Sequence, residues 1–226
     1  MCVNYTPTRK EQLTQFGVIS AHLDDYKPET WQDYVAPIIR HNNGEREAVL
    51  AAYSMVPKSK MPAGVKRFST MNARAETIGQ LRTYAKPWRE GKLCLVPMQD
   101  FFEPCYESGK AERWRIGLVD ETDFAVAGLF QDWLEPDGQR SFSFTQITIN
   151  ADEHPLMRRF HPSGEEKRSL VVVHRSDYDD WLDCKNPERA RSFLQLYPAE
   201  RMRAEIALKQ PQPVKPQPVV QQGSLF

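Results

Sequence analysis

The sequence predicts an α+β fold with a curved, barrel-like β-sheet core and flanking helices. Strand-like and helix-like segments are interspersed without a regular βαβ repeat, and residues 141–149 alternate polar and apolar side chains as SFSFTQITI. The chain has 226 residues, of which 40% are hydrophobic, which is enough to bury a substantial core. We therefore expect one domain over residues 1–207, followed by a disordered tail over residues 208–226.

In the first half of the chain, two helices and two strands are predicted. Thr8 can cap a short helix over residues 8–16. A second helix is expected over residues 76–84, ending before Pro87, because a proline disfavours helical geometry in the residue that precedes it. Two apolar runs predict buried strands: residues 47–55 (EAVLAAYSM) and residues 92–98 (KLCLVPM).

In the second half, the segments are mostly strand-like. Ser176 and Asp179 resemble a capping box for a helix over residues 177–183. Pro187 suits the first turn of a final helix that ends near Leu196. Strands are expected at residues 114–119, 124–129, 141–149 and 170–174.

The second residue of the chain is a cysteine, Cys2. If Met1 is removed, Cys2 presents a free α-amine and a thiol on adjacent carbons. Such an aminothiol can condense with an aldehyde to a Schiff base and then close to a five-membered thiazolidine. The amine is a good nucleophile near neutral pH, because a model α-amino group has a pKa of ~7.7–8.0, whereas a lysine has ~10.4. The alternative is that Cys2 merely follows the initiator.

Composition narrows the class of protein. The formal net charge is +0, and no apolar run is long enough to span a membrane or to form a signal peptide. We expect a cytoplasmic protein without a disulfide framework or a zinc site, because the cysteines are far apart and form no CxxC pair. We expect no other metal and no cofactor. The cysteines are Cys2, Cys94, Cys105 and Cys184, and a buried thiol is the default expectation for Cys105.

Positive charge is concentrated in residues 58–92, which hold nine Lys or Arg residues and two acids. Phe68, Tyr84 and Trp88 lie within the same stretch. Basic residues with interleaved aromatics suit a phosphate backbone and unstacked bases. The alternative is an ordinary solvated surface.

Four separated segments line up with one family. They are Met1-Cys2, residues 71–77 (MNARAET), residues 100–104 (DFFEP) and residues 147–152 (ITINAD) leading to His161. Over roughly residues 1–200, the chain resembles the SRAP family, the SOS response-associated peptidases.

The resemblance implies a single SRAP-like domain that acts in the DNA-damage response. It implies that Cys2 forms a covalent thiazolidine crosslink with the aldehyde of abasic sites in single-stranded DNA. Glu103 and His161 would move protons in that reaction, and Asn72 and Arg74 would hold a phosphate or the sugar beside the lesion. The family label also implies a hydrolase or lyase whose peptidase activity removes Met1 or cleaves at Cys2.

Each of these residues has a plainer alternative. His161 can be a surface-loop histidine, Glu103 a solvated strand end, and Arg74 a partner of Glu76 on the same face of an extended segment. At the level of the whole protein, the alternatives are an N-terminal-nucleophile amidohydrolase, in which the α-amine of the cysteine is the base, and a non-catalytic module that binds single-stranded DNA.

The chain departs from the family pattern at several positions. Val3-Asn4 stands where the family usually has Gly-Arg, and Val56-Pro57 is followed by lysine and serine where the family often has Trp. A wedge that stacks on bases is therefore lost or replaced; the candidate replacements are Met55, Met61 and Phe68.

The last residues, 208–226, are rich in Pro and Gln and cannot bury a core. They end in QGSLF, which resembles the pentapeptide that binds the bacterial sliding clamp. In this resemblance Gln222, Leu225 and Phe226 would contact the clamp, whereas Gly223 departs from the usual Leu. The alternative is a frayed terminus with chance apolar residues.

Overall fold

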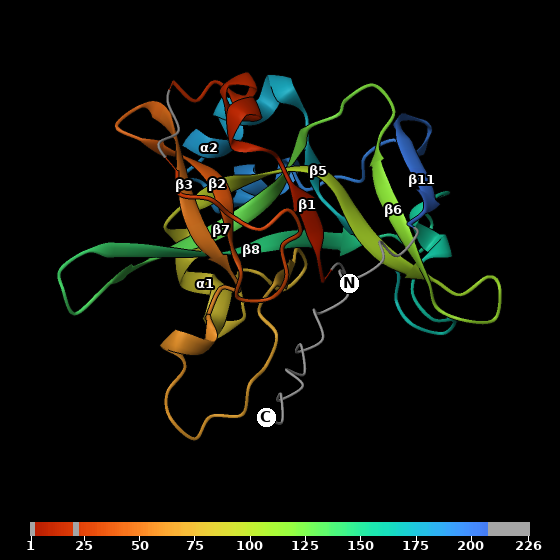
Figure 1. The fold of residues 1–226 in the computed structure, drawn as a ribbon, viewed down its shortest axis with the longest axis horizontal. Helices are drawn as coiled ribbons and strands as arrows, with labels where there is room; N and C mark the ends of the chain where they lie inside the picture. The colour runs from red at the N-terminus through yellow and green to blue at the C-terminus, as the bar shows by residue number, and fades with distance from the viewer. Residues whose placement is uncertain (1–2, 20–22, 208–226) are drawn as a thin grey trace, which may run out of the picture.

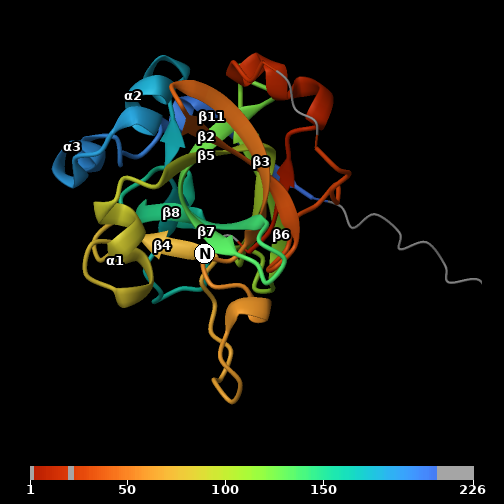
Figure 2. The ribbon, with the colours of Figure 1, turned by 90° about the vertical axis from the view of Figure 1, so that its left-hand side faces the viewer.

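A closed β-barrel lies at the centre of the computed structural model, which describes residues 3–19 and 23–207. Within these residues, five strands of a larger sheet close in the order β5-β7-β8-β3-β2 and back to β5. Figure 2 looks into this ring. The barrel strands are β2 (Val35–Asn42), β3 (Glu45–Tyr53), β5 (Leu93–Cys105), β7 (Phe124–Leu134) and β8 (Arg140–Asn150). The predicted α+β fold with a barrel-like core is confirmed.

Strand β5 is buried on both faces. Leu93 and Leu95 pack into one core cluster, which includes Trp181 of the helix Tyr178–Asp183. Cys94 and Val96 point to the opposite face and pack into a second cluster, which includes Phe144 of β8. Because successive side chains of a strand point to opposite faces, this two-sided burial requires a continuous apolar run rather than an alternating one. The sequence KLCLVPM meets that requirement.

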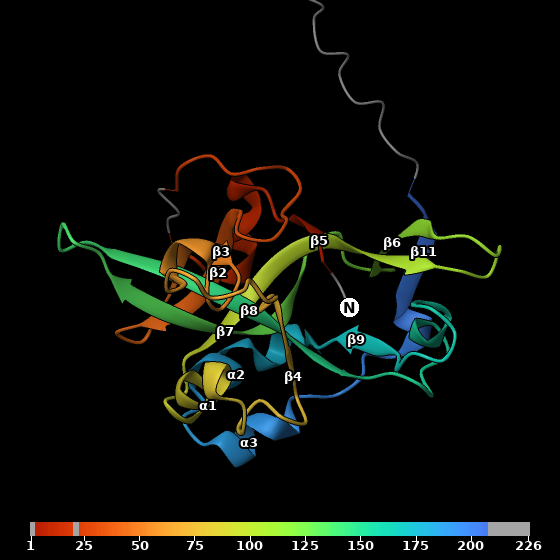
Figure 3. The same cartoon turned by 90° about the horizontal axis from the view of Figure 1, so that it is seen from below.

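Six shorter strands extend the barrel at its edges. β1 and β6 pair with β5, β4 and β9 pair with β8, β10 pairs with β7, and β11 pairs with β6. Figure 3 shows β6 and β11 projecting together from one side. These strands are β1 (Tyr5–Pro7), β4 (Asn72–Arg74), β6 (Glu112–Leu118), β9 (Arg168–Leu170), β10 (Val172–Val173) and β11 (Met202–Ile206).

The three α-helices gather at the other side of the barrel, as Figure 3 shows. They are α1 (Arg82–Arg89), α2 (Tyr178–Asp183) and α3 (Pro187–Ser192). Short 3₁₀ segments complete the described chain: η1 (Lys10–Phe16), η2 (Lys58–Lys60), η3 (Met157–Arg159), η4 (Arg175–Asp177) and η5 (Ala199–Arg201). The indole N–H of Trp181 in α2 donates to the carbonyl of Cys94 at 2.9 Å, so this helix is fastened to β5.

The predicted strands are confirmed, but β5 and β7 run seven and five residues further than expected. The predicted strand at residues 170–174 is divided: β9 pairs with β8, and β10 pairs with β7. Strand β2 was not predicted, although its signal is present. Asn43 and Gly44 have φ of 53° and 84°, and such an Asn-Gly pair joins the two strands of a tight hairpin.

The helix predicted at residues 76–84 is wrong. The helix begins at Arg82 and contains Pro87. Tyr84, Ala85 and Trp88 are buried on one face, and this packing outweighs the backbone hydrogen bond that Pro87 cannot make.

The other helices differ in detail. Residues 10–16 form a 3₁₀ segment without a side-chain cap from Thr8. The capping box at Ser176 is absent, because its hydroxyl donates to Asp177 instead. The last helix is capped by Asn186, begins at Pro187 as predicted, and ends at Ser192.

Candidate active site

The C-terminal half of β5 places Glu103 beside His161. Glu103 is 3% exposed and His161 is 5% exposed, and Oε2 of Glu103 lies 3.5 Å from Nε2 of His161. The backbone N–H of His161 donates to the carbonyl of Pro104 at 2.9 Å, which fixes the loop against the strand. The alternatives of a solvated strand end for Glu103 and of a surface-loop histidine for His161 are therefore wrong.

Burial changes the acid–base chemistry of both side chains. It raises the pKa of Glu103 to about 8 from 4.5. Burial, with the nearby positive charge of Lys167 as a smaller cause, lowers the pKa of His161 to about 4 from 6.5. Near neutral pH we therefore interpret this contact as one between a protonated carboxyl and a neutral imidazole rather than as an ion pair. The two groups can supply and accept protons there.

Strand β1 leads toward this pair. Tyr5 is in register with Phe101, and the carbonyl of Asn4 accepts from the N–H of Phe102 at 3.2 Å. The chain traced back from Tyr5 thus runs along β5 in the direction of Glu103. Cys2 itself lies outside the described residues.

Strand β4 carries the two predicted DNA contacts. Asn72 and Arg74 flank the fully buried Ala73, so they share the outer face as expected. The guanidinium of Arg74 forms an ion pair with Glu166, and its side chain is 45% exposed. The alternative pairing of Arg74 with Glu76 is wrong, because Glu76 pairs with Arg168 at 2.9 Å.

Three consecutive residues that the sequence analysis left without roles connect these elements. Glu166 pairs with Arg74. The ammonium of Lys167 donates to the carbonyl of His161 at 2.9 Å. Arg168 is 2% exposed and binds Glu76, Glu166 and the carbonyl of Thr148. The run EEKR has the composition of a solvated surface, and only the fold reveals that its arginine is buried.

The basic stretch 58–92 is less free than its composition indicates. In the described part of the chain, five of its nine cations form ion pairs with acids. Tyr84 and Trp88 are buried and do not offer faces to bases. Of the proposed wedge residues, Met55 is buried, whereas Phe68 is 49% exposed.

Two further residues near the site have structural contacts. Cys105 is buried, as expected, and its thiol contacts the carbonyl of Arg159 at 3.7 Å. His154 is buried and accepts the backbone N–H groups of Leu156 and Met157 at one ring nitrogen, so it orders the turn before His161.

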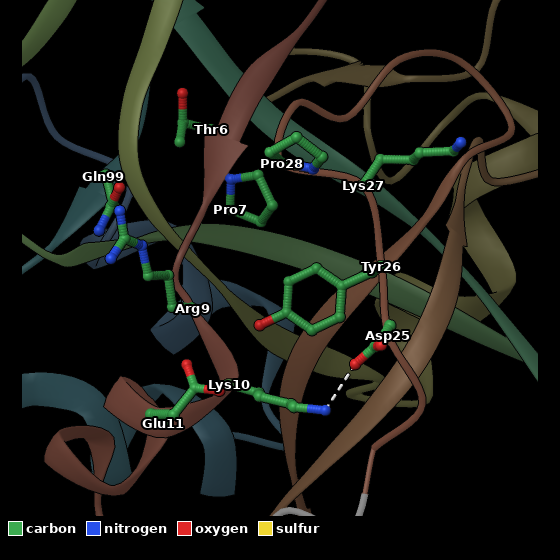
Figure 4. Close-up of a pocket in the computed structure, with 10 residues that line it drawn as sticks. All are labelled: Thr6, Pro7, Arg9, Lys10, Glu11, Asp25, Tyr26, Lys27, Pro28 and Gln99. Carbon is green, nitrogen blue, oxygen red and sulfur yellow. Dashed lines mark hydrogen bonds and ion pairs between the residues drawn. The ribbon is translucent and has the colours of Figure 1, made fainter.

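A surface pocket of about 380 Å³ lies against the outer side of β1 (Figure 4). Lys10 pairs with Asp25 at its rim, and the hydroxyl of Tyr26 donates to the carbonyl of Thr8. None of the site residues predicted within the described chain lines this pocket. The acid–base pair is therefore separate from it.

Comparison with known proteins decides the family. The model of the family "SOS response associated peptidase (SRAP)" matches residues 1–209. The chain belongs to the SRAP family. Among relatives of the SRAP domain, the "Abasic site processing protein YoqW" of Bacillus subtilis (strain 168) is 33% identical over 140 residues, which is 61% of this chain and 59% of that protein. The chain thus spans about three fifths of the length of that relative. The "Abasic site processing protein YoaM" of the same organism is 30% identical over 61% of this chain and 58% of its own length.

Solved structures agree with this assignment. A protein from Bordetella bronchiseptica has a TM-score of 0.82 at 32% identity, covering 92% of this chain and all of its own. A protein from Bacteroides thetaiotaomicron has a TM-score of 0.72 at 20% identity, covering 91% of each chain, and it supports the fold alone. In the described part of this SRAP chain, no helix is long and apolar enough to cross a membrane.

The raised pKa of Glu103 predicts that Glu103→Gln changes the pH dependence of stability. Between pH 4.5 and 8 the unfolded chain loses the proton of Glu103 while the folded chain keeps it, so the free energy of unfolding falls as pH rises. His161 acts oppositely, but only between pH 6.5 and about 4. Above pH 6.5, the free energy of unfolding of Glu103→Gln relative to that of the wild type should therefore rise by about 1.4 kcal/mol per pH unit until about pH 8.

Urea unfolding at pH 6.5, 7.2 and 8 measures this gain. Glu112→Gln, on the neighbouring strand β6, is measured beside it as the matched control. A difference between Glu103→Gln and the wild type that does not change with pH would contradict a carboxyl that is protonated in the folded protein.

Proposed function

We propose that this protein processes abasic sites in single-stranded DNA by covalent capture through Cys2. The observation that carries the proposal is the direction of β1, which brings the start of the described chain along β5 to the buried Glu103–His161 pair. Membership of the SRAP family and the names of the relatives support the substrate class. Cys2 precedes Val3, the first described residue on this path, by one position in the sequence.

The reaction conserves oxidation state. The α-amine of Cys2 adds to the open aldehyde of the abasic deoxyribose, and the carbinolamine loses water to give a Schiff base. The thiol sulfur then bonds to the same carbon while the thiol proton passes to the nitrogen, which closes the thiazolidine. One water molecule leaves in total, and no cofactor is required.

Glu103 and His161 fit the proton transfers of this reaction. Opening the sugar ring and expelling water both need an acid, and a carboxyl that keeps its proton near neutral pH can supply one. A neutral imidazole can accept the proton released when the amine attacks. The two groups lie 3.5 Å apart, so a proton can also return from one to the other between steps.

We propose that residues of β4 contact the DNA beside the lesion. Arg74 is half-exposed and can exchange Glu166 for a phosphate, and Asn72 on the same face can bind the neighbouring sugar or phosphate. Phe68 is exposed in the preceding loop and can stack on a base. Single-stranded DNA suits this site because the lesion is reached without unpairing a duplex.

The peptidase label of the family fits one required step. The α-amine of Cys2 is free only after hydrolysis of the Met1–Cys2 peptide bond, so we include this cleavage in the proposed function. The proposal thus includes hydrolase chemistry for maturation and lyase-like chemistry for lesion capture.

Residues Gln222, Leu225 and Phe226, which lie outside the described residues, are proposed to bind the bacterial sliding clamp. An amide and two apolar anchors on a tether can fill a small pocket and raise the local concentration of the domain at replicated DNA. The full chain should bind the clamp in a pull-down with purified proteins, and the double variant Leu225→Ala/Phe226→Ala should not. Equal binding of both proteins would refute this partner.

Cys2→Ala should abolish covalent capture and leave reversible DNA binding intact, because only the sulfur and the ring that it closes are lost. The measurement is a denaturing gel with an oligonucleotide that carries one abasic site, beside a binding assay with an uncleavable analogue of the site. Undiminished crosslinking by Cys2→Ala would refute covalent capture through Cys2. Turnover of an amide substrate without a crosslink would favour the amidohydrolase instead.

Arg74→Ala should weaken binding to single-stranded DNA. It should also reduce the magnitude of the slope of log K against log salt concentration by about one, as expected when one phosphate contact is lost. Arg189→Ala is the matched control, because Arg189 is an exposed arginine in an ion pair with Asp180 on the helical side. Affinity and salt slope should not change in the control. An unchanged slope in Arg74→Ala would exclude the phosphate contact.

A further inference from the structure

His161 has a backbone conformation that is uncommon for residues other than glycine. Its φ is 68°, in the left-handed region that is costly for side chains with a Cβ. A residue keeps such a conformation only where the surrounding structure fixes it. Part of the constraint is the hydrogen bond from the N–H of His161 to the carbonyl of Pro104.

Lys167 supplies the second part. Its ammonium donates to the carbonyl of His161 at 2.9 Å and to the carbonyl of Pro162 at 2.7 Å. These two carbonyls come directly after the strained φ, so the lysine holds the loop at the point where it would otherwise relax. An ammonium has three donors, and two of them are used in this way.

Lys167 is itself held from both sides. Its backbone N–H donates to the carboxylate of Asp152 at 2.8 Å. The next residue, Arg168, is buried and bound to Glu76 and to the carbonyl of Thr148 on β8. The ammonium therefore projects from a fixed piece of backbone and can transmit that rigidity to His161.

We propose that Lys167 is a positioning residue that holds His161 against Glu103, and that its ammonium does not serve as a phosphate contact. This inference rests on the proposed function, because it concerns the acid–base pair of that reaction. The competing role arises because Lys167 also lines a cavity of about 580 Å³ together with Arg158 and Arg159. A phosphate in that cavity would have to draw the ammonium away from two backbone carbonyls.

The test compares Lys167→Met with Lys167→Arg. Single-turnover crosslinking at saturating abasic DNA should slow by about tenfold or more in Lys167→Met, because small misplacements of a catalytic group cost this much. Affinity for the uncleavable analogue and its salt slope should stay within about twofold of wild type. Lys167→Arg should recover most of the rate, because a guanidinium can also donate to two carbonyls.

Two controls make the result specific. Lys185→Met removes another lysine that donates to a backbone carbonyl, that of Gly91 at 3.1 Å on the helical side, and should crosslink at the wild-type rate. His161→Ala sets the rate without the imidazole. If Lys167→Met instead lowers affinity and salt slope but keeps its rate at saturation, Lys167 is a phosphate contact and the inference is wrong. A wild-type rate together with wild-type affinity also overturns it.

A measurement without DNA separates this inference from the proposed function. In the free protein, NMR of the imidazole should show the pKa of His161 rising from about 4 toward 6.5 in Lys167→Met, because the ring loses both its enclosure and a nearby positive charge. Glu103 stays protonated through this titration.

An unchanged His161 signal refutes the positioning role even if abasic DNA proves not to be the substrate. A wild-type rate in His161→Ala refutes only the role of His161 in the proposed function. If Lys167→Met does not fold, Lys167→Gln is measured in the same way.

Discussion

The pairing of β5 with its neighbours is the constraint on which the rest of the structure depends. Its first half closes the barrel, through the pairs Leu95 with Ala127 of β7 and Ile39 of β2 with Leu95. Its second half leaves the barrel and pairs with β1 on one edge and β6 on the other. Glu103 lies in this second half, so the same continuous strand is both the structural closure and the support of the site. A strand whose backbone is bonded on both edges has little freedom to move, so the backbone that carries Glu103 is held in place.

A second determinant is the charge network around Arg168. Removing a guanidinium from water is costly unless its donors are satisfied. Here two carboxylates and the carbonyl of Thr148 accept from the two terminal nitrogens of the guanidinium, and one of those carboxylates, Glu166, also pairs with Arg74. The outer face of β4 and the loop of His161 are therefore connected through one buried cation. A ligand that draws Glu166 away from Arg74 changes the surroundings of the segment that holds His161.

Local patterns predicted four of the five barrel strands, all except β2, because each needs an apolar run or an alternation that is visible in a few residues. The same reasoning failed where tertiary packing outweighed a local rule, as when the buried face of α1 accommodated Pro87. It also failed for three-residue strands such as β4, whose pairing partner is more than seventy residues away. Glu103 and His161 were predicted by resemblance to a family, but the burial of His161 was not, because it arises from contacts between its loop and the distant strand β5. Lys167 had no detectable signal, since a lysine that binds backbone carbonyls looks like any surface lysine in a sequence.

The position of β11 determines where the chain leaves the domain. Trp114 of β6 is in register with Glu103 on one side and with Ile206 on the other. Neighbouring strands are ~4.8 Å apart, so the backbone of Ile206 lies about 10 Å from that of Glu103 across the sheet. The described chain therefore ends near the acid–base pair rather than at the opposite end of the molecule. A partner bound directly after Ala207 would lie at the same edge of the protein at which the lesion is proposed to bind.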